Sequence, residues 1–271
     1  MLKFWKMNGA GNDFVVLDNR DLSNSLSGEQ IERLCNRQRG VGADGLLAVE
    51  PAQNGADFRM RYYNADGGEA EMCGNGARCF GKFVNFLHDN SLEKTSFETI
   101  AGVISAEFVG ENVRVELSPP FDLAPGTELD LGGETHTVHS VNTGVPHAVI
   151  FVDELNEIDL QRLGAATRFH EHFAPAGTNC NFVKINAPGD LSIRTYERGV
   201  EGETLACGTG MAACAIIHHQ LETVDSPVKI TVAGGDTLEI GFNHLGDGNY
   251  ENVTLLGPAE FTFEGILSTA P

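Results

Sequence analysis

The sequence RYYNADGGEAEMCGNGARCF, residues 61–80, places a cysteine and a glycine-rich turn directly before a run of small and apolar residues. The composition after Cys73 is typical of a helix, so we expect the thiol at a helix N-terminus. There the unpaired backbone N–H groups and the helix dipole favour an anion and lower the pKa of a thiol. The glycines also let a carboxylate approach the backbone. Taken alone, the pattern would still favour a buried structural cysteine.

A second copy of this pattern changes that interpretation. Residues 206–214 read ACGTGMAAC, with Cys207 standing 134 residues after Cys73. When the sequence is aligned with itself at this offset, residues 11–16 match residues 145–150. Tyr63-Asn64 then falls near Tyr196-Glu197. The sequence therefore predicts two copies of one unit, each with a cysteine at the head of an apolar helix.

Length and composition limit the function. The chain has 271 residues, with 38 Asp and Glu against 18 Lys and Arg, and a formal charge of -20. Such a charge repels nucleic acid and anionic membrane surfaces. A nucleic-acid role is therefore not expected. We find neither an apolar run near twenty residues nor a signal-peptide pattern, so we expect a soluble, cytoplasmic protein.

The six cysteines are too few for a disulfide scaffold, and no Cys-x-x-Cys pair suggests zinc. We expect reduced thiols and no metal. Four of them stand in apolar surroundings and are interpreted as core residues: Cys35, Cys79, Cys180 and Cys214.

In the first half, two strands at 4–7 and 14–17 are expected around a turn at 8–12. Ser27 to Gln30 form a capping box for a helix to about Gln38. Further strands are expected at 46–49, 58–63, 103–104 and 113–117. The helix at 75–88 is apolar on more than one face, so it should be buried inside a wrapped sheet.

The second half repeats this order after Ser118-Pro119-Pro120, the best candidate for a boundary. A helix is expected from Asp159 to about His172, a loop at 177–181 before a strand at 182–185, and a buried helix at 208–220. Alternating strands follow from 229 to 263. We therefore predict an α+β fold of two pseudo-symmetric domains, residues 1–118 and 119–261.

Two such thiols suit the inversion of a carbon centre. Racemisation removes a proton from one face and delivers another to the opposite face, and a thiolate and thiol pair can exchange these roles. The backbone amides of Gly74-Asn75 and Gly208-Thr209 are placed to receive the charge that develops on a carboxylate. Arg198 is a candidate partner for a substrate carboxylate, and Glu197 for an ammonium or a cysteine proton, although a surface ion pair is the simpler alternative.

Six segments resemble diaminopimelate epimerase, a family of amino-acid epimerases that need no pyridoxal phosphate. They read MNGAGNDFVVLDN, RGVGADGLL, YYNADGGEAEMCGNGARC, GVPHAV, GTNCNFV and YERGVEGETLACGTG, and the resemblance covers nearly the whole chain. It implies two similar domains, each a barrel-like, mostly antiparallel sheet around a central buried helix, with the substrate between them. It also implies that the tail at about 262–271 returns to the first domain, and a homodimer without a cofactor. The implied reaction interconverts LL- and meso-2,6-diaminopimelate, in lysine and peptidoglycan precursor biosynthesis.

The resemblance also implies roles for individual residues. Cys73 and Cys207 become the base and acid pair, with His147 and Glu197 supporting their protonation. Gly74-Asn75 and Gly208-Thr209 hold the carboxylate at the reacting carbon. The implied substrate contacts are Asn12, Asn64, Asn179, Glu197 and Arg198.

Three positions depart from the family pattern. Gly45 stands where some members have Gln, and Val145 where many have Asn, so distal substrate contacts are lost there. Phe263 replaces a tyrosine often found at the dimer contact. The reacting centre is retained.

Alternatives remain open at this level. Within the fold, the substrate could be another amino acid, histidine or proline for example. From other classes, Cys73 and Cys207 could form a redox-sensing disulfide, or the protein could be a non-catalytic binding module. Because the two thiols have the same kind of local sequence, the sequence does not assign which of them is the thiolate in the resting protein. The excess of acidic residues also does not decide whether the habitat is saline.

Overall fold

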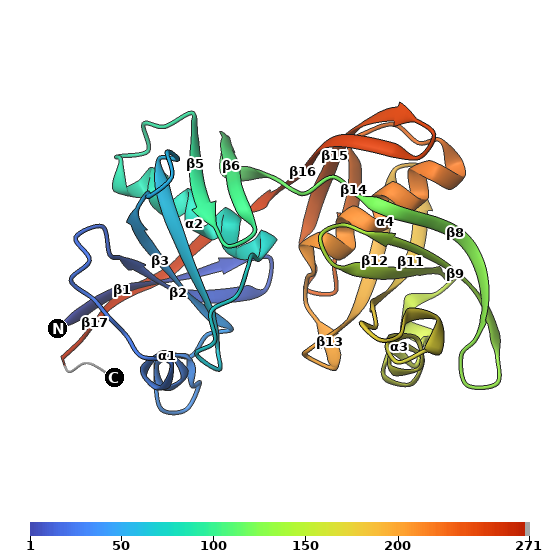
Figure 1. Cartoon of the computed structure of the whole chain (residues 1–271), viewed down its shortest axis with the longest axis horizontal. Helices are drawn as coiled ribbons and strands as arrows, with labels where there is room; N and C mark the ends of the chain where they lie inside the picture. Colours follow the sequence, from blue (N-terminus) through green and yellow to red (C-terminus); the bar gives the residue numbers. More distant parts are fainter. Residues whose placement is uncertain (269–271) are drawn as a thin grey trace. The chain divides into compact units, whose positions relative to one another are not determined.

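The computed structural model describes residues 1–268 and divides into two compact units (Figure 1). Of the described residues, the first unit contains Met1–Val115 and residues 257–268, and the second contains Glu116–Leu256. The chain thus leaves the first unit before the proline pair at 119–120 and returns to it for its last strand. The predicted α+β class is confirmed.

The first unit consists of a mostly antiparallel sheet and two helices. Its elements are β1 (Leu2–Gly9), β2 (Asn12–Asp18), α1 (Gly28–Cys35), β3 (Gly45–Pro51), β4 (Phe58–Asn64), α2 (Gly74–Leu87), β5 (Lys94–Thr99), β6 (Gly102–Val109), β7 (Asn112–Glu116) and β17 (Glu260–Leu267).

The elements of the second unit are β8 (Phe121–Asp130), β9 (Thr135–Asn142), β10 (Pro146–Phe151), η1 (Leu155–Glu157), α3 (Leu160–Arg168), η2 (Glu171–Phe173), β11 (Asn179–Ala187), β12 (Asp190–Glu197), β13 (Gly202–Thr204), α4 (Gly208–Glu222), β14 (Val228–Thr231), β15 (Thr237–Gly246) and β16 (Asn249–Pro258). The second unit repeats the order of the first with β8 first, where the first unit has β17 last, and adds η1, η2 and β13.

Strand pairing shows that the two units are copies of one topology. In the first, neighbours run in the order β17, β1, β2, β3, β4, β5, β6 and β7. In the second they run β8, β9, β10, β11, β12, β14, β15 and β16. Two neighbouring pairs are parallel in each order, β2/β3 and β4/β5 in the first and β10/β11 and β12/β14 in the second. These are the third and fifth pairs of each order, and all other pairs are antiparallel. The predicted pseudo-symmetry is therefore present in the hydrogen bonding itself.

A buried helix fills each sheet, as its apolar sequence predicts. α2 packs against β1, β2, β3 and β6, and α4 packs against β9, β10, β11, β14 and β15 (Figure 1). Residues on all sides of both helices are buried, including Phe80 and Phe83 in α2 and Ile216 and Ile217 in α4. Helices apolar all round require such a surrounding sheet.

The hairpin of β1 and β2 brings the first strand close to α2. Its turn residues Ala10 and Gly11 have φ values of 59° and 87°, as a two-residue hairpin turn requires. At Gly9 an added Cβ would lie 2.9 Å from the carbonyl oxygen of Asn75. The glycine therefore allows β1 to pass directly over the first turn of α2.

Several element boundaries differ from those predicted, among them those of α1, α3 and β11. α1 ends at Cys35 rather than near Gln38, because the Asn36 side chain accepts hydrogen bonds from the amides of residues 38 and 39 and forms a turn. α3 ends at Arg168, and the His170 ring accepts a bond from the amide of His172 in a separate short helix. β11 begins at Asn179, which the sequence placed in a loop.

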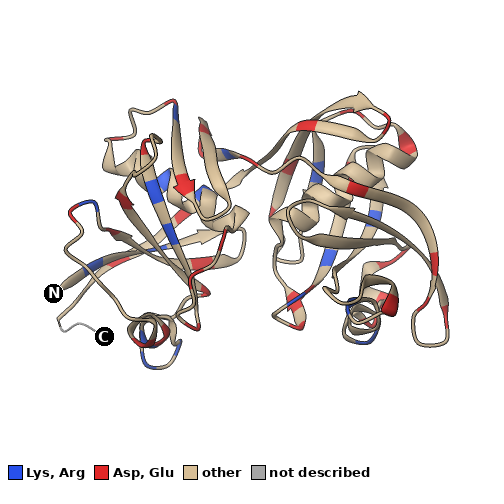
Figure 2. Cartoon of the chain, viewed as in Figure 1, with Lys and Arg blue, Asp and Glu red and all other residues tan. Residues whose placement is uncertain are grey.

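Acidic side chains are distributed over both units, and Lys and Arg are fewer (Figure 2). None of the helices within residues 1–268 has the length and apolarity needed to span a membrane.

Candidate active site

Cys73 is the N-cap of α2, the position that the sequence predicts. Its backbone is extended, with φ -140° and ψ 122°, and its sulfur accepts a hydrogen bond from the Gly76 amide at 3.5 Å. Gly74 and Asn75 form the first turn and are buried. The sulfur therefore lies among the helix N-terminal amides, where a thiolate is stabilised.

The structure brings Asn12 to this thiol. Asn12 begins β2, and its Oδ1 accepts from the Cys73 sulfur at 3.4 Å. Its Nδ2 donates to Asp44 Oδ2 at 2.7 Å. Because the carboxylate can only accept when ionised, it orients the amide so that oxygen faces the thiol.

Asp44 is in turn part of an ionic network that includes Asp13 of β2. Arg37 binds Asp44 at 2.8 Å and Asp13 through two hydrogen bonds, while Lys6 reaches Asp13 at 2.7 Å. Burial alone would raise the pKa of Asp13, but its bonds with Arg37 and Lys6 outweigh this and lower the pKa to about 2. Asp13 is therefore ionised at neutral pH and fixes both cations.

Asn64 lies at the end of β4, where its Oδ1 accepts from the hydroxyl of Tyr62 at 2.8 Å. Its contacts thus run to its own strand and the following loop. Gly45 pairs with Asn64 across the sheet, and a Cβ at Gly45 would lie 2.5 Å from the carbonyl oxygen of Tyr63. The structure therefore accounts for glycine at this position by close approach of the neighbouring strand.

Cys207 is the N-cap of α4 and is 7% exposed. Its sulfur lies 3.6 Å from the hydroxyl of Thr209, and the same hydroxyl lies 2.9 Å from His147 Nε2. Thr143 fixes this turn from the other side, because its hydroxyl donates to the carbonyl of Thr209 at 2.9 Å. His147 is thereby linked to Cys207 through one side chain.

His147 is buried on β10, and its Nδ1 lies 3.2 Å from Nδ2 of Asn181. Burial, aided by the charge of Arg198, lowers the pKa of His147 to about 3. The imidazole is therefore neutral at any pH near 7. This histidine supports a neighbouring group as a neutral hydrogen-bonding residue rather than as a cation.

Asn179 organises the segment that carries Glu197 and Arg198. Its Nδ2 donates to the carbonyl of Pro146 at 3.2 Å, and its Oδ1 accepts from the backbone amide of Arg198 at 2.8 Å. The guanidinium of Arg198 donates to the Ala176 carbonyl at 3.2 Å. Burial raises the pKa of Glu197. The Glu197-Arg198 pair is thus held in the same part of the unit as His147 rather than forming an isolated surface ion pair.

The two thiols do not share one environment, contrary to the expectation from their sequences. The Cys73 sulfur meets an amide oxygen backed by an ionic network. The Cys207 sulfur meets a hydroxyl backed by a neutral histidine. Two similar N-cap cysteines are therefore contacted by chemically different side chains.

Sequence reasoning missed several of these supports. Asp44 and Arg37 stand in a loop whose contacts only the fold reveals, and Thr143 and Asn181 have no motif of their own. One signal was available: Asp13 lies over His147 at the repeat offset, which marks both as equivalent positions.

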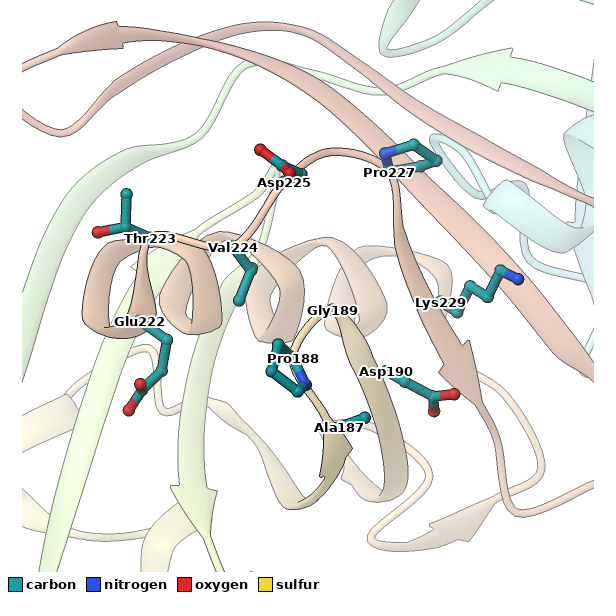
Figure 3. Close-up of a pocket in the computed structure, with 10 residues that line it drawn as sticks. All are labelled: Ala187, Pro188, Gly189, Asp190, Glu222, Thr223, Val224, Asp225, Pro227 and Lys229. Carbon is teal, nitrogen blue, oxygen red and sulfur yellow. The ribbon is translucent and has the colours of Figure 1, made fainter.

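A surface cavity of about 590 Å³ in the second unit is distinct from this chemistry (Figure 3). Glu222 and Thr223, at the C-terminus of α4, contribute to its wall together with Asp190 and Lys229. Cys207 stands at the other end of this 15-residue helix, about 20 Å away at 1.5 Å per residue. The cavity therefore belongs to a different part of the unit.

Comparison with known proteins identifies the family. The family model for diaminopimelate epimerase matches residues 4–121 and 139–261. The diaminopimelate epimerase of Hydrogenobaculum sp. is 44% identical over 277 residues, covering 97% of this chain and 97% of that protein. That of Chlorobaculum tepidum is 43% identical over 265 residues, covering 97% of this chain and 100% of that protein.

Solved structures show the same fold at lower identity. A probable proline racemase from Agrobacterium radiobacter has a TM-score of 0.71 at 16% identity, covering 100% of this chain and 94% of that one. A hydroxyproline epimerase from Agrobacterium vitis has a TM-score of 0.69 at 14% identity, covering 97% of this chain and 90% of that one. These matches confirm the predicted barrel-like architecture. Because the family model and the relatives cover nearly its whole length, the chain belongs to the diaminopimelate epimerase family.

Proposed function

We propose that this protein interconverts LL-2,6-diaminopimelate and meso-2,6-diaminopimelate by two-base proton transfer at an alpha carbon. The observation that carries the proposal is the pair of N-cap cysteines, Cys73 on α2 and Cys207 on α4, at equivalent places of a repeated topology. Its relatives of 44% and 43% identity are named for this activity. The reaction would serve lysine and peptidoglycan precursor synthesis.

The chemistry assigns complementary roles to the two thiols. One sulfur, as thiolate, removes the alpha proton from one face of the carbon, and the other delivers a proton to the opposite face. The reaction leaves the protonation of the two sulfurs exchanged, so the same pair works in either direction. No cofactor is needed for these steps.

The carbanion that develops needs stabilisation at the adjacent carboxylate. The amides of Gly74, Asn75, Gly208 and Thr209 lie in the first turns of α2 and α4, and such amides stabilise developing negative charge. Removing a donor of this kind costs about a hundred- to a thousandfold in rate.

The remaining polar residues would bind and orient the substrate. Arg198 suits a carboxylate of the distal amino-acid group, and Glu197 suits an ammonium. His147 supports Cys207 through Thr209. We assign the other substrate contacts to Asn12, Asn64 and Asn179, with Asn12 also holding the Cys73 proton.

Deuterium exchange tests the reaction directly. The protein is incubated with LL-diaminopimelate in deuterium oxide without added cofactor, and alpha-deuterium and product stereochemistry are followed. We expect deuterated meso product, reduced by about a hundred- to ten-thousandfold in Cys73→Ala and in Cys207→Ala. Cys79→Ala and Cys214→Ala are matched controls, since these thiols are buried on the same two helices away from the N-caps.

The same assay discriminates other substrates and classes. Histidine and proline are run in parallel, and exchange with one of these alone would replace the substrate but keep the mechanism. Absence of exchange with all three would contradict the proposal and direct attention to thiol oxidation.

We also propose a homodimer, with β17 in the contact. Phe261, Phe263 and Ile266 on this strand are 39%, 48% and 64% exposed. Exposed apolar side chains gathered on one strand favour a protein contact.

A further inference from the structure

A run of hydrogen bonds in the second unit leads from Asn181 to the sulfur of Cys207. Asn181 Nδ2 lies 3.2 Å from His147 Nδ1, His147 Nε2 lies 2.9 Å from Thr209 Oγ1, and Thr209 Oγ1 lies 3.6 Å from the sulfur. Asn181 is fully buried and belongs to neither the thiol pair nor the substrate contacts assigned above. Its role depends on which way each hydrogen in this run points.

The orientation of the Asn181 amide is set by two partners. Its Nδ2 lies 2.9 Å from the carbonyl oxygen of Ala148, which can only accept a hydrogen bond. Its Oδ1 lies 2.9 Å from the hydroxyl of Thr195, which donates to it. Rotating the amide by half a turn would place oxygen against the Ala148 carbonyl. The nitrogen must therefore face Ala148, and its second hydrogen points to His147.

This amide selects one tautomer of His147. A neutral imidazole carries one hydrogen, and Nδ1 must be the acceptor because Asn181 donates to it. The hydrogen is therefore on Nε2, which donates to Thr209 Oγ1. The lowered pKa of His147, about 3, keeps the second nitrogen unprotonated at neutral pH.

The Thr209 hydroxyl then has one remaining direction for its own hydrogen. Its oxygen already accepts from His147, and its hydrogen is available to the Cys207 sulfur. A hydroxyl donor stabilises a thiolate over a thiol. With the opposite tautomer, Nε2 would compete for this hydrogen, and the sulfur would lose the donor.

We propose that Asn181 is a positioning residue that locks the tautomer of His147 and so directs the Thr209 hydroxyl hydrogen to the Cys207 sulfur. The use of this thiolate in epimerisation rests on the proposed function; the hydrogen-bond direction itself does not. Cys73 provides an internal comparison, because its sulfur is connected instead to Asn12 and Asp44.

The position of Asn181 leaves little freedom around this arrangement. An added Cβ at Gly210 would lie 2.5 Å from Asn181 Oδ1 and 3.3 Å from the Cys207 sulfur. The first turn of α4 is therefore packed directly against the amide, with glycine as the residue that fits.

Nitrogen NMR of the wild-type protein tests the tautomer without substrate. Histidine labelled with ¹⁵N is observed through its ring protons, and His147 is assigned as the resonance pair missing in His147→Gln. We expect the protonated-nitrogen shift at Nε2 and the acceptor shift at Nδ1. The proton on Nδ1 would overturn the proposal, and this readout needs no variant of Asn181.

Cysteine alkylation then tests the consequence at sulfur. The rate of iodoacetamide labelling is followed against pH for each cysteine by peptide mass spectrometry. In Asn181→Asp the carboxylate accepts from Nδ1 and reverses the tautomer, so Cys207 should label about tenfold more slowly at pH 7, as for loss of one hydrogen bond to a charged group. Cys73 in the same sample should be unchanged. An unchanged pH profile for Cys207, with the reversed tautomer seen by NMR, would contradict the proposal.

A second pair of variants avoids the added charge of aspartate. Thr195→Val removes only the bond to Asn181 Oδ1, and Thr195→Ser retains it, so slowed labelling of Cys207 in the valine variant should be restored in the serine variant. Equal labelling in both would also count against the lock. Failure of wild type to exchange diaminopimelate would overturn the proposed function alone, since neither readout uses substrate.

Discussion

Asp13 on β2 and His147 on β10 occupy equivalent positions in the two units: Asp13 immediately precedes the parallel pairing of β2 with β3, and His147 begins that of β10 with β11. The residue after each one pairs in the same way, Phe14 with Gly45 in the first unit and Ala148 with Cys180 in the second. Asp13 is held ionised by Lys6 and Arg37, whereas His147 is held neutral by burial. The same backbone position thus carries a member of an ionic network in the first unit and a neutral, hydrogen-bonded histidine in the second.

The Asp13 network should make stability depend on acid pH. The pKa of Asp13 falls from 3.8 to about 2 on folding, so its contribution is present above pH 4 and is lost as the pH falls toward 2. At 1.36 kcal/mol per pKa unit, the contribution to the free energy of unfolding is about 2 kcal/mol at pH 7.

The free energy of unfolding in urea should therefore differ most between wild type and Asp13→Asn at neutral pH. This difference should become smaller below pH 4. Glu111→Gln is the control, because the Glu111 side chain is 99% exposed. A gap independent of pH would show that Asp13 acts through packing alone.

His147 should affect stability over a higher pH window than Asp13, from about 3 to 6.5, and in the same direction. Its folded pKa of about 3 lies below the ordinary 6.5, so the unfolded chain binds one more proton between these values. Stability should fall as the pH drops through this window, and His147→Gln should show a shallower fall. The measurement is the free energy of unfolding against pH, with exposed His172→Gln as the control. Parallel curves for wild type and His147→Gln would refute the assigned pKa.

The two first-turn glycines Gly76 and Gly210 should respond differently to alanine. At Gly76 the nearest atoms to an added Cβ are side-chain atoms at 3.4 Å, which is ordinary contact, while at Gly210 the Asn181 oxygen would lie at 2.5 Å. Gly76→Ala should be neutral or gain up to about 1 kcal/mol from helix propensity. Gly210→Ala should lose stability by about 1–3 kcal/mol from overpacking and lose exchange activity. Thermal unfolding and the deuterium assay measure both, and equal behaviour of the pair would contradict the geometry.

The proposed dimer should depend on Phe263. Its ring packs edge-on against Phe4 with centroids 6.1 Å apart and leaves about half of its surface exposed. Burying a charge in an apolar contact is unfavourable, so Phe263→Glu should shift a dimer toward monomer in sedimentation velocity. Val103→Glu is the matched control, because Val103 is 60% exposed on β6. A dimer unaffected by Phe263→Glu would place the contact elsewhere.

Several features could be predicted from the sequence because they are local or periodic. The repeat offset of 134 residues, the apolar helices and the glycines after Cys73 and Cys207 each appear as a pattern in the chain. The α+β class follows from these patterns, the family from the resemblance of six sequence segments, and both are confirmed. The shorter α1 and α3 were missed because side chains of Asn36 and His170 bond nearby amides and compete with helix continuation.

The sequence by itself determined where the two thiols stand, since an N-cap is fixed by the few residues around it. Only the tertiary structure decided what each thiol meets. Asn12 reaches Cys73 across 61 positions, and His147 reaches Thr209 across 62, through strands that pair with partners distant in the chain. The direction of a hydrogen bond and the pKa of a buried group depend on all the atoms that surround it. For that reason the two similar sequence motifs place their thiols in different chemical surroundings.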